Sequence, residues 1–315
     1  MNSSLKAHIS LFLAQVIYAL NYSIAKDLMP TYIKPLGLVM MRISGALLLF
    51  WIMSFFSKRE PLEKGDLKKM MLLAFFGVAV NQAFFIYGLS LTKPINSAII
   101  MVSNPIAVML FTIFIFKERF TFYKLTGLAF GVIGALTLLL FKAHGAFAIG
   151  SETIAGDLMT LINSLSWAVF VVMAKPYIQK YQTVTVMKWI FLFGFIYMFP
   201  FGMPDLLSVQ WQALSSQTIF AMAFVVVATT FLAYLLNTYA LKALSSSVVS
   251  MYIYLQPFLA TTIAIVLGKD EITTIKIISA SLIISGVYLA SRKTKEENIS
   301  LKIRFVKLYK KIIKS

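Results

Sequence analysis

The sequence predicts an all-α integral membrane protein whose ten transmembrane helices form two inverted five-helix repeats, with both termini in the cytoplasm. Three observations support this prediction. The 315-residue chain is 59% hydrophobic and 13% charged, whereas a soluble domain has about 25% charged residues. Ten apolar stretches are long enough to cross a hydrocarbon core of about 30 Å. The second half of the chain also repeats features of the first half.

Short connections that are polar or contain Pro or Gly separate the ten predicted spans, so we expect no inserted soluble domain. The first span is too long for a cleavable signal peptide, and Asn21 and Lys26 interrupt it. The predicted spans are residues 8–29, 36–56, 68–90, 95–116, 121–141, 155–177, 184–203, 216–240, 246–268 and 273–292.

The distribution of Lys and Arg predicts the orientation, because cytoplasmic loops are enriched in these residues. With a cytoplasmic N-terminus, the inner loops and the C-terminal tail hold 22 of the 29 basic residues, and the outer loops hold six. We therefore expect a multi-pass protein of a cell membrane, inner or plasma, with both termini inside.

The tail, residues 293–315, is strongly basic. On a helix, its apolar residues would share one face and its basic residues another, which is typical of an interfacial helix on anionic lipids. A basic tail that only fixes the topology is the alternative. Neither interpretation involves nucleic acid, although the net charge of the chain is +17.

The residue inventory argues against an enzyme. Cysteine is absent and the two histidines, His8 and His144, lie outside the span interiors, so thiol chemistry, a metal site and most histidine catalysis are excluded. No GxxxxGK[ST] loop is present, so we expect no ATP use by this chain and no cofactor. An intramembrane protease would also need paired carboxylates or a base inside a span.

A shift of 152 residues aligns residues 79–139 with 231–291 without a gap. Asn104-Pro105 then meets Gln256-Pro257, and Glu118 meets Asp270. The predicted units are residues 7–141 and 155–292. Because each unit has five spans, the second enters the membrane from the opposite side, as in many secondary transporters.

The two five-span units, the prolines of the fourth and ninth spans, and the turns Lys-Glu-Arg-Phe-Thr121 and Lys-Asp-Glu-Ile-Thr273 resemble the drug/metabolite transporter superfamily. The chain is most similar to its EamA-type branch of ten-helix permeases, over about residues 7–292. It departs from that branch at Phe116, where Gly is frequent, whereas Gly268 fits. The resemblance implies a transporter, often an exporter of amino acids or other small metabolites, with a central cavity between the halves.

Polar side chains inside spans need a partner or a cavity. Several stand three or four residues apart on one helical face and lie near mid-span, where a substrate site is expected. Hydrogen bonding between helices, worth about 0.6 kcal/mol each, is the alternative. The cavity candidates are Tyr18, Asn21, Asn81, Gln82, Asn104, Asn163, Trp167, Tyr234, Asn237, Tyr252 and Gln256.

Pro105 and Pro257 lie inside their spans, each after an amide residue. Proline removes a backbone hydrogen bond and kinks a helix. Because the two prolines stand at matched positions, we expect hinges that serve a rocking motion of the halves. A static packing kink is the alternative.

All twelve carboxylates lie in loops or near span ends, which disfavours a proton-coupled exporter of cationic drugs. The charges that enter spans are positive: Lys26, Arg42, Lys175 and Lys188. A cationic cavity edge suits a carboxylate-bearing or zwitterionic solute. Snorkelling of the lysines to the membrane surface is the alternative.

The repeat places two lysines at opposite mouths of the protein. We expect two equivalent ion-pair gates, an outer one between Lys26 and Asp270 or Glu271 and an inner one between Lys175 and Glu118.

Small residues recur in the fifth and tenth spans and predict close helix packing there, in a scaffold or a homodimer. They are Gly127, Gly131, Gly134, Ser281, Ser285 and Gly286. The sequence as a whole predicts a secondary transporter that exports amino acids or similar zwitterionic or anionic solutes by alternating access. A channel or facilitator, and then a multidrug exporter, are the alternatives.

Overall fold

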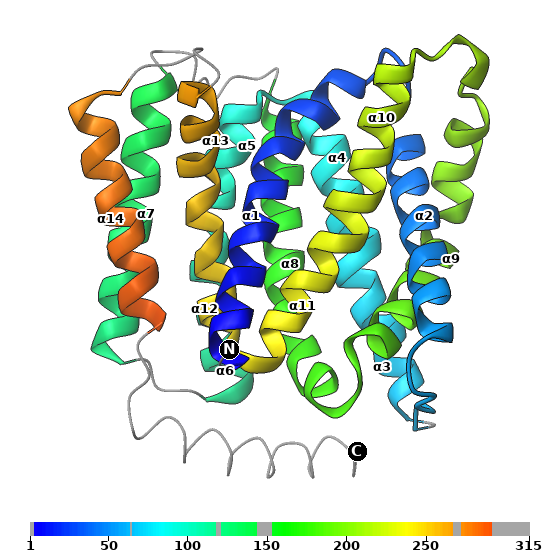
Figure 1. The fold of residues 1–315 in the computed structure, drawn as a ribbon, viewed down its shortest axis with the longest axis horizontal. Helices are drawn as coiled ribbons and strands as arrows, with labels where there is room; N and C mark the ends of the chain where they lie inside the picture. Colours follow the sequence, from blue (N-terminus) through cyan, green and yellow to red (C-terminus); the bar gives the residue numbers. More distant parts are fainter. Residues whose placement is uncertain (1–2, 64, 118–120, 144–152, 267–271, 292–315) are drawn as a thin grey trace.

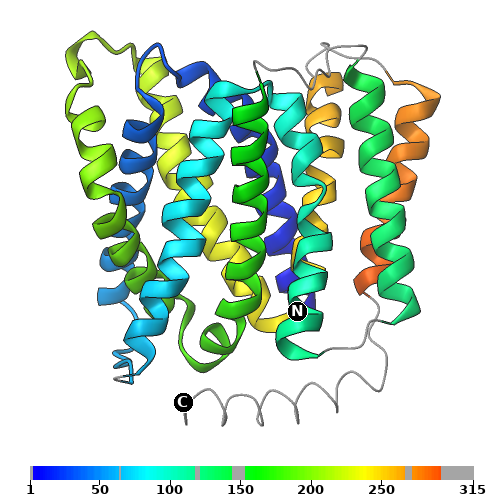
Figure 2. The same cartoon turned by 180° about the vertical axis from the view of Figure 1, so that it is seen from behind.

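The computed structural model describes residues 3–63, 65–117, 121–143, 153–266 and 272–291. Within these ranges the chain is helical, without strands, and the helices run between two faces of one bundle (Figures 1 and 2). We call the face at which α1 begins and α14 ends the N-terminal face. The first half comprises α1 (Ser3–Leu28), α2 (Pro35–Phe55), α3 (Asp66–Ala74), η1 (Phe75–Val80), α4 (Asn81–Leu91), α5 (Pro94–Met101), α6 (Asn104–Phe116) and α7 (Phe122–Ala143).

The second half has the same order of long and interrupted helices. It comprises α8 (Ile154–Lys180), α9 (Thr183–Leu207), η2 (Trp211–Ala213), α10 (Ser216–Phe224), η3 (Val225–Leu232), α11 (Ala233–Ala243), α12 (Ser246–Met251), η4 (Tyr252–Tyr254), α13 (Leu255–Val266) and α14 (Thr274–Ser291).

In the described part of the chain, nine helices are long and apolar enough to cross a membrane. They coincide with nine of the ten predicted spans. The remaining one, residues 246–268, is not a single helix but is divided into α12, η4 and α13. The all-α integral membrane fold is thus confirmed, whereas the inverted repeat and the cytoplasmic termini stay predictions.

Both spans that contain the matched prolines are interrupted one turn before the proline. Helix α5 ends at Met101, the residue whose carbonyl would have bonded to an amide hydrogen on Pro105. The 3₁₀ segment η4 includes Ile253, which has the same relation to Pro257. Proline therefore breaks both helices where the sequence predicted kinks, and the hinge role stays a prediction.

Two further irregular segments lie in the helices that precede these spans. The π-helical segments η1 and η3 interrupt the hydrophobic runs from α3 to α4 and from α10 to α11. Shifted by 152 residues, η1 falls inside η3. Sequence analysis did not predict them, although π-helical turns occur frequently at functional sites.

A polar cluster joins the α2–α3 connection to the α8–α9 junction at the N-terminal face. Lys180 Nζ lies 2.6 Å from Glu63 Oε2 and 2.7 Å from Asp66 Oδ2. The Tyr181 hydroxyl donates to Asp66 Oδ2 at 2.7 Å. Burial raises the pKa of Tyr181, so this hydroxyl stays protonated and donates at neutral pH. The cluster therefore connects the first half of the chain to the second.

The small residues of the fifth and tenth predicted spans pack helix α7 directly against α14. A Cβ on Gly127 would lie 2.6 Å from the Gly286 carbonyl oxygen, and one on Gly286 would lie 2.7 Å from the Gly127 oxygen. Close backbone approach thus explains these glycines within one chain. A homodimer through α7 and α14 stays a prediction.

Gly127→Ala is expected to lower the thermal midpoint of the detergent-solubilised protein, because the added methyl group must separate α7 from α14 at a cost of about 1–3 kcal/mol. Gly65→Ala is the matched control, since a Cβ there meets nothing within 4 Å. Equal midpoints for both variants would contradict the close α7–α14 contact.

Candidate functional site

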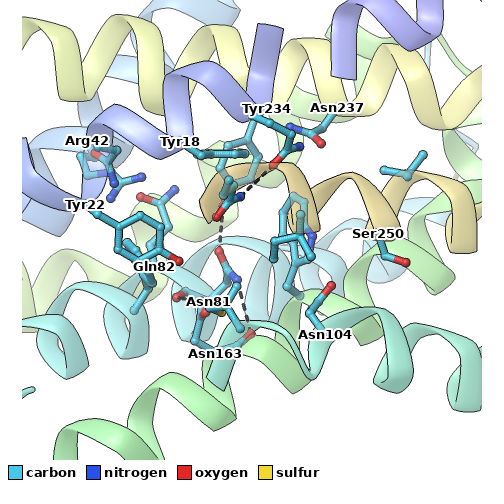
Figure 3. A pocket seen from close by; sticks show the side chains of 18 residues that line it. Tyr18, Tyr22, Arg42, Asn81, Gln82, Asn104, Asn163, Tyr234, Asn237 and Ser250 are labelled. Carbon is cyan, nitrogen blue, oxygen red and sulfur yellow. Dashed lines mark hydrogen bonds between the residues drawn. The ribbon is translucent and has the colours of Figure 1, made fainter. Parts of the chain in front are cut away.

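A polar cavity lies in the middle of the bundle. Helices α1 and α11 form one wall and α4 and α8 the facing wall, with α2, α5, α6, α12, η4 and α13 completing the lining (Figure 3). Its volume is about 90 Å³. The lining residues are Gln15, Tyr18, Asn21, Tyr22, Arg42, Asn81, Gln82, Phe85, Met101, Asn104, Asn163, Trp167, Tyr234, Asn237, Val249, Ser250, Ile253 and Gln256.

Ten of the eleven cavity candidates predicted from the sequence line this one cavity. Tyr252 does not. Its hydroxyl lies 2.6 Å from His8 Nδ1, in an apolar groove beside α14. Tyr252 and Gln256 are four residues apart, but the 3₁₀ turn of η4 changes the direction of the Tyr252 side chain relative to a regular α-helix.

An amide–phenol network joins the two walls. Asn163 Nδ2 donates to the Asn81 backbone oxygen at 2.7 Å, which links α8 to α4. The Tyr234 hydroxyl on α11 lies 3.0 Å from Asn81 Oδ1 (Figure 3). It also lies 2.9 Å from the Gly77 oxygen of η1. A π-helical segment thus presents a carbonyl that a side chain of the facing wall binds.

Two asparagines keep an acceptor available. Asn104 Nδ2 donates to the Ser164 backbone oxygen at 2.7 Å, and Asn163 Nδ2 is used on Asn81. Because the NH₂ groups already donate hydrogen bonds, the side-chain oxygens are the atoms of these amides that remain to accept one. Neither Asn104 Oδ1 nor Asn163 Oδ1 has a hydrogen-bond partner in the described part of the chain.

Arg42 supplies the charge of the cavity. Its side chain is 3% exposed, and its Nε donates to the Thr230 hydroxyl of η3 at 2.9 Å. Thr230 in turn donates to the Val225 oxygen at 2.8 Å, which holds the hydroxyl in place to accept. Among the described residues no carboxylate pairs with this guanidinium, and its Nη1 has no partner.

Besides Arg42, seven lining residues were not among the predicted cavity candidates: Gln15, Tyr22, Phe85, Met101, Val249, Ser250 and Ile253. Four are apolar and so carry no sign of a polar site. Helical spacing was an available signal, because Phe85 follows Gln82 by three residues and Ile253 precedes Gln256 by three. Arg42 was recognised as a charge within a span but not included among the cavity candidates.

The predicted gate lysines lie toward opposite faces of the bundle. Lys26 is near the end of α1, and Lys175 is near the end of α8, at the N-terminal face. Both donate to backbone carbonyls at the ends of other helices. The acidic partners predicted for them, Glu118, Asp270 and Glu271, lie outside the described residues, as does the tail 293–315.

The fold and the central polar cavity define a multi-pass membrane protein of the transporter type. The model of the EamA-like transporter family matches residues 5–140 and 154–292. The chain therefore belongs to the EamA-like transporter family, whose name points to a membrane transporter rather than an enzyme.

Two of the following three relatives, similar in sequence to this chain, are named as transporters. An uncharacterized transporter of Archaeoglobus fulgidus is 25% identical over 93% of this chain and 99% of its own length. The uncharacterized transporter YyaM of Bacillus subtilis is 25% identical over 74% of this chain and 77% of its own. A WAT1-related protein of Arabidopsis thaliana is 24% identical, covering 89% and 77% of the two chains.

A solved crystal structure superposes on this chain with a TM-score of 0.71 at 18% identity. The match covers 92% of this chain and 96% of the other. At this identity the likeness shows a shared fold only.

Tyr234→Phe is expected to lower the free energy of unfolding by about 1–3 kcal/mol, because the Gly77 oxygen and Asn81 Oδ1 lose their donor inside the membrane. Thermal unfolding in detergent measures the loss. Tyr239→Phe, on an exposed part of the same helix, should leave the midpoint unchanged. A Tyr234→Phe midpoint equal to that of Tyr239→Phe would contradict the network.

Proposed function

We propose that this transporter carries small zwitterionic or carboxylate-bearing metabolites of amino-acid size, which it exports across a cell membrane by alternating access about the central cavity. The observation that carries the proposal is the Arg42 guanidinium, buried in a mid-membrane cavity with a free Nη1. The amide oxygens and the volume of the cavity limit which solutes can bind next to Arg42.

A buried cation in a membrane is costly unless an anion or several acceptors accompany it. In the described part of the chain, Thr230 provides Arg42 with a neutral hydroxyl only. A carboxylate is the natural complement, because its two oxygens match the planar donors of a guanidinium. Arg42 is therefore the group that would bind the negative end of a solute.

The amide oxygens suit the positive end of the same solute. Asn104 Oδ1 and Asn163 Oδ1 are buried acceptors without partners among the described residues, and so is Asn21 Oδ1. An ammonium group supplies three donors and could bind more than one of these oxygens. The lining thus offers a cation on one side and acceptors on another (Figure 3), the arrangement that a zwitterion requires.

The cavity size favours a small solute. A volume of 90 Å³ corresponds to about three waters at roughly 30 Å³ each, so the cavity suits a small solute. An adjoining apolar chamber of about 230 Å³ shares Tyr22, Met101, Ile253 and Gln256 with the cavity. This chamber gives room for an apolar side chain.

Alternating access requires helices that can bend around the site. The α5–α6 break and the η4 segment each lie next to lining residues, and the lining residues Met101 and Ile253 are 152 residues apart. An inverted repeat would give the inward-open and outward-open states similar energies. These features support a carrier mechanism, and the transporter names of the relatives support the general activity.

Arg42→Gln is expected to reduce the initial rate of solute efflux from proteoliposomes by about 10- to 100-fold, the loss that corresponds to one charge-assisted hydrogen bond. The assay loads a pool of radiolabelled amino acids and follows efflux with and without unlabelled amino acids outside. Acceleration by outside solute distinguishes a carrier from a channel. Lys34→Gln is the control, because Lys34 is a surface residue whose side chain is 63% exposed.

Efflux that is saturable, accelerated from the far side and lost in Arg42→Gln would support the proposal. Equal efflux from the Arg42→Gln and Lys34→Gln proteins would contradict the role of Arg42. Flux that does not saturate would indicate a channel.

A further inference from the structure

Lys26 fastens helix α1 to the end of helix α4. Its Nζ lies 2.8 Å from the Leu89 oxygen, 3.0 Å from the Ser90 oxygen and 3.1 Å from the Thr92 oxygen. An ammonium group has three donors, and here all three have backbone acceptors. The last carbonyls of a helix lack intrahelical partners and carry a partial negative charge, so they form a suitable site for a lysine.

Lys175 repeats this contact at the other face of the protein. On α8, its Nζ donates to the Leu241 oxygen at 3.1 Å and to the Leu244 oxygen, at the end of α11. The acceptors Leu89 and Leu241 are 152 residues apart, which is the offset of the sequence repeat. The two contacts are therefore equivalent but lie toward opposite faces of the membrane.

Both contacts cross between the two walls of the cavity. Helix α1 packs along α11, and α4 packs along α8. Lys26 joins the first of these pairs to the second near one face, and Lys175 joins them near the N-terminal face. A movement that separates the walls at one face must break the lysine contact at that face and can leave the other intact.

An aromatic contact lies between each lysine and the centre of the cavity. Tyr22 and Phe85 meet edge to face with ring centroids 5.5 Å apart, one turn before Lys26 on α1 and one turn before Leu89 on α4. Trp167 and Tyr234 meet edge to face at 5.4 Å, two turns before Lys175 on α8 and Leu241 on α11. All four rings line the cavity. Each lysine contact thus has an aromatic pair between it and the cavity.

We propose that Lys26 and Lys175 are two latches whose alternate release opens the central cavity to one side of the membrane and then to the other. This inference rests on the proposed carrier function. The acceptors described for the two lysines are backbone carbonyls at the ends of α4 and α11. Release becomes favourable when water enters that face and hydrates the ammonium group and the carbonyls together.

The absence of cysteine permits a test that needs no substrate. Ser250→Cys places one thiol in the cavity lining with a nearly isosteric change. The anionic, membrane-impermeant reagent 2-sulfonatoethyl methanethiosulfonate is applied to intact cells for the outer side and to inside-out vesicles for the inner side. The modification rate of the thiol then reports how open the cavity is to each side.

Lys26→Met is expected to raise the modification rate about tenfold from one side only, and Lys175→Met about tenfold from the other side only, the change that about 1.4 kcal/mol produces. Lys26→Arg and Lys175→Arg keep the donors and should restore rates near those of the parent. Lys34→Met and Lys68→Met are the controls, because both residues lie exposed at the surface.

Three results would contradict the latch proposal. The modification rates could rise from the same side in both Met variants, rise equally from both sides, or not change. General loosening of the fold gives the second of these results, together with a lower thermal midpoint. Opposite-sided responses without amino-acid efflux in proteoliposomes would instead contradict the proposed substrate and leave the latches supported. Efflux without opposite-sided responses would overturn the latches alone.

Discussion

Hydrocarbon offers no hydrogen bonds, so every polar group that this chain places in the membrane must find its partner inside the protein. This constraint explains why the polar side chains converge on one cavity and why several of them bind backbone carbonyls. It also makes the groups without partners at the cavity informative. Arg42 Nη1, Asn104 Oδ1 and Asn163 Oδ1 are buried without a hydrogen bond in the described part of the chain. In a bilayer such groups are stable only if water or a solute forms a hydrogen bond with them.

The irregular segments of the helices serve the same constraint. The π-helical segment η1 presents the Gly77 carbonyl to Tyr234, and η3 presents Thr230 to Arg42. Proline breaks before Asn104 and near Gln256 bring side-chain amides and irregular backbone to the cavity. Regular helix would have kept these backbone groups within the intrahelical ladder. Lys26 and Lys175 donate hydrogen bonds to backbone carbonyls at the ends of α4 and α11. The same two contacts hold the walls of the cavity together.

Sequence reasoning predicted the spans and most of the cavity because both depend on strong local signals. Apolar length located the spans, and amide or aromatic residues inside them located ten of the lining positions. The π-helical segments have no comparable signal, because their residues are ordinary apolar ones and tertiary packing decides the helix type. Tyr252 was predicted to line the cavity for a related reason. The prediction assumed regular α-helical spacing, whereas residues 252–254 form the 3₁₀ segment η4. The lysine acceptors could not be predicted, because a backbone carbonyl is present at every residue and only the fold selects which ones are reached.

If the cavity binds a carboxylate-bearing solute at Arg42, solute binding should change the fluorescence of Trp167, which lines the same cavity. Replacing Trp51, Trp189 and Trp211 by Phe leaves Trp167 as the single tryptophan, and that residue lines the cavity. The purified protein is titrated with a pool of amino acids and with the matching pool of amino acid amides, which lack the carboxylate. We expect a saturable change in Trp167 fluorescence with the amino acids, and we expect it to be lost with the amides and in Arg42→Gln. The same saturable change with both pools, or its persistence in Arg42→Gln, would contradict this expectation.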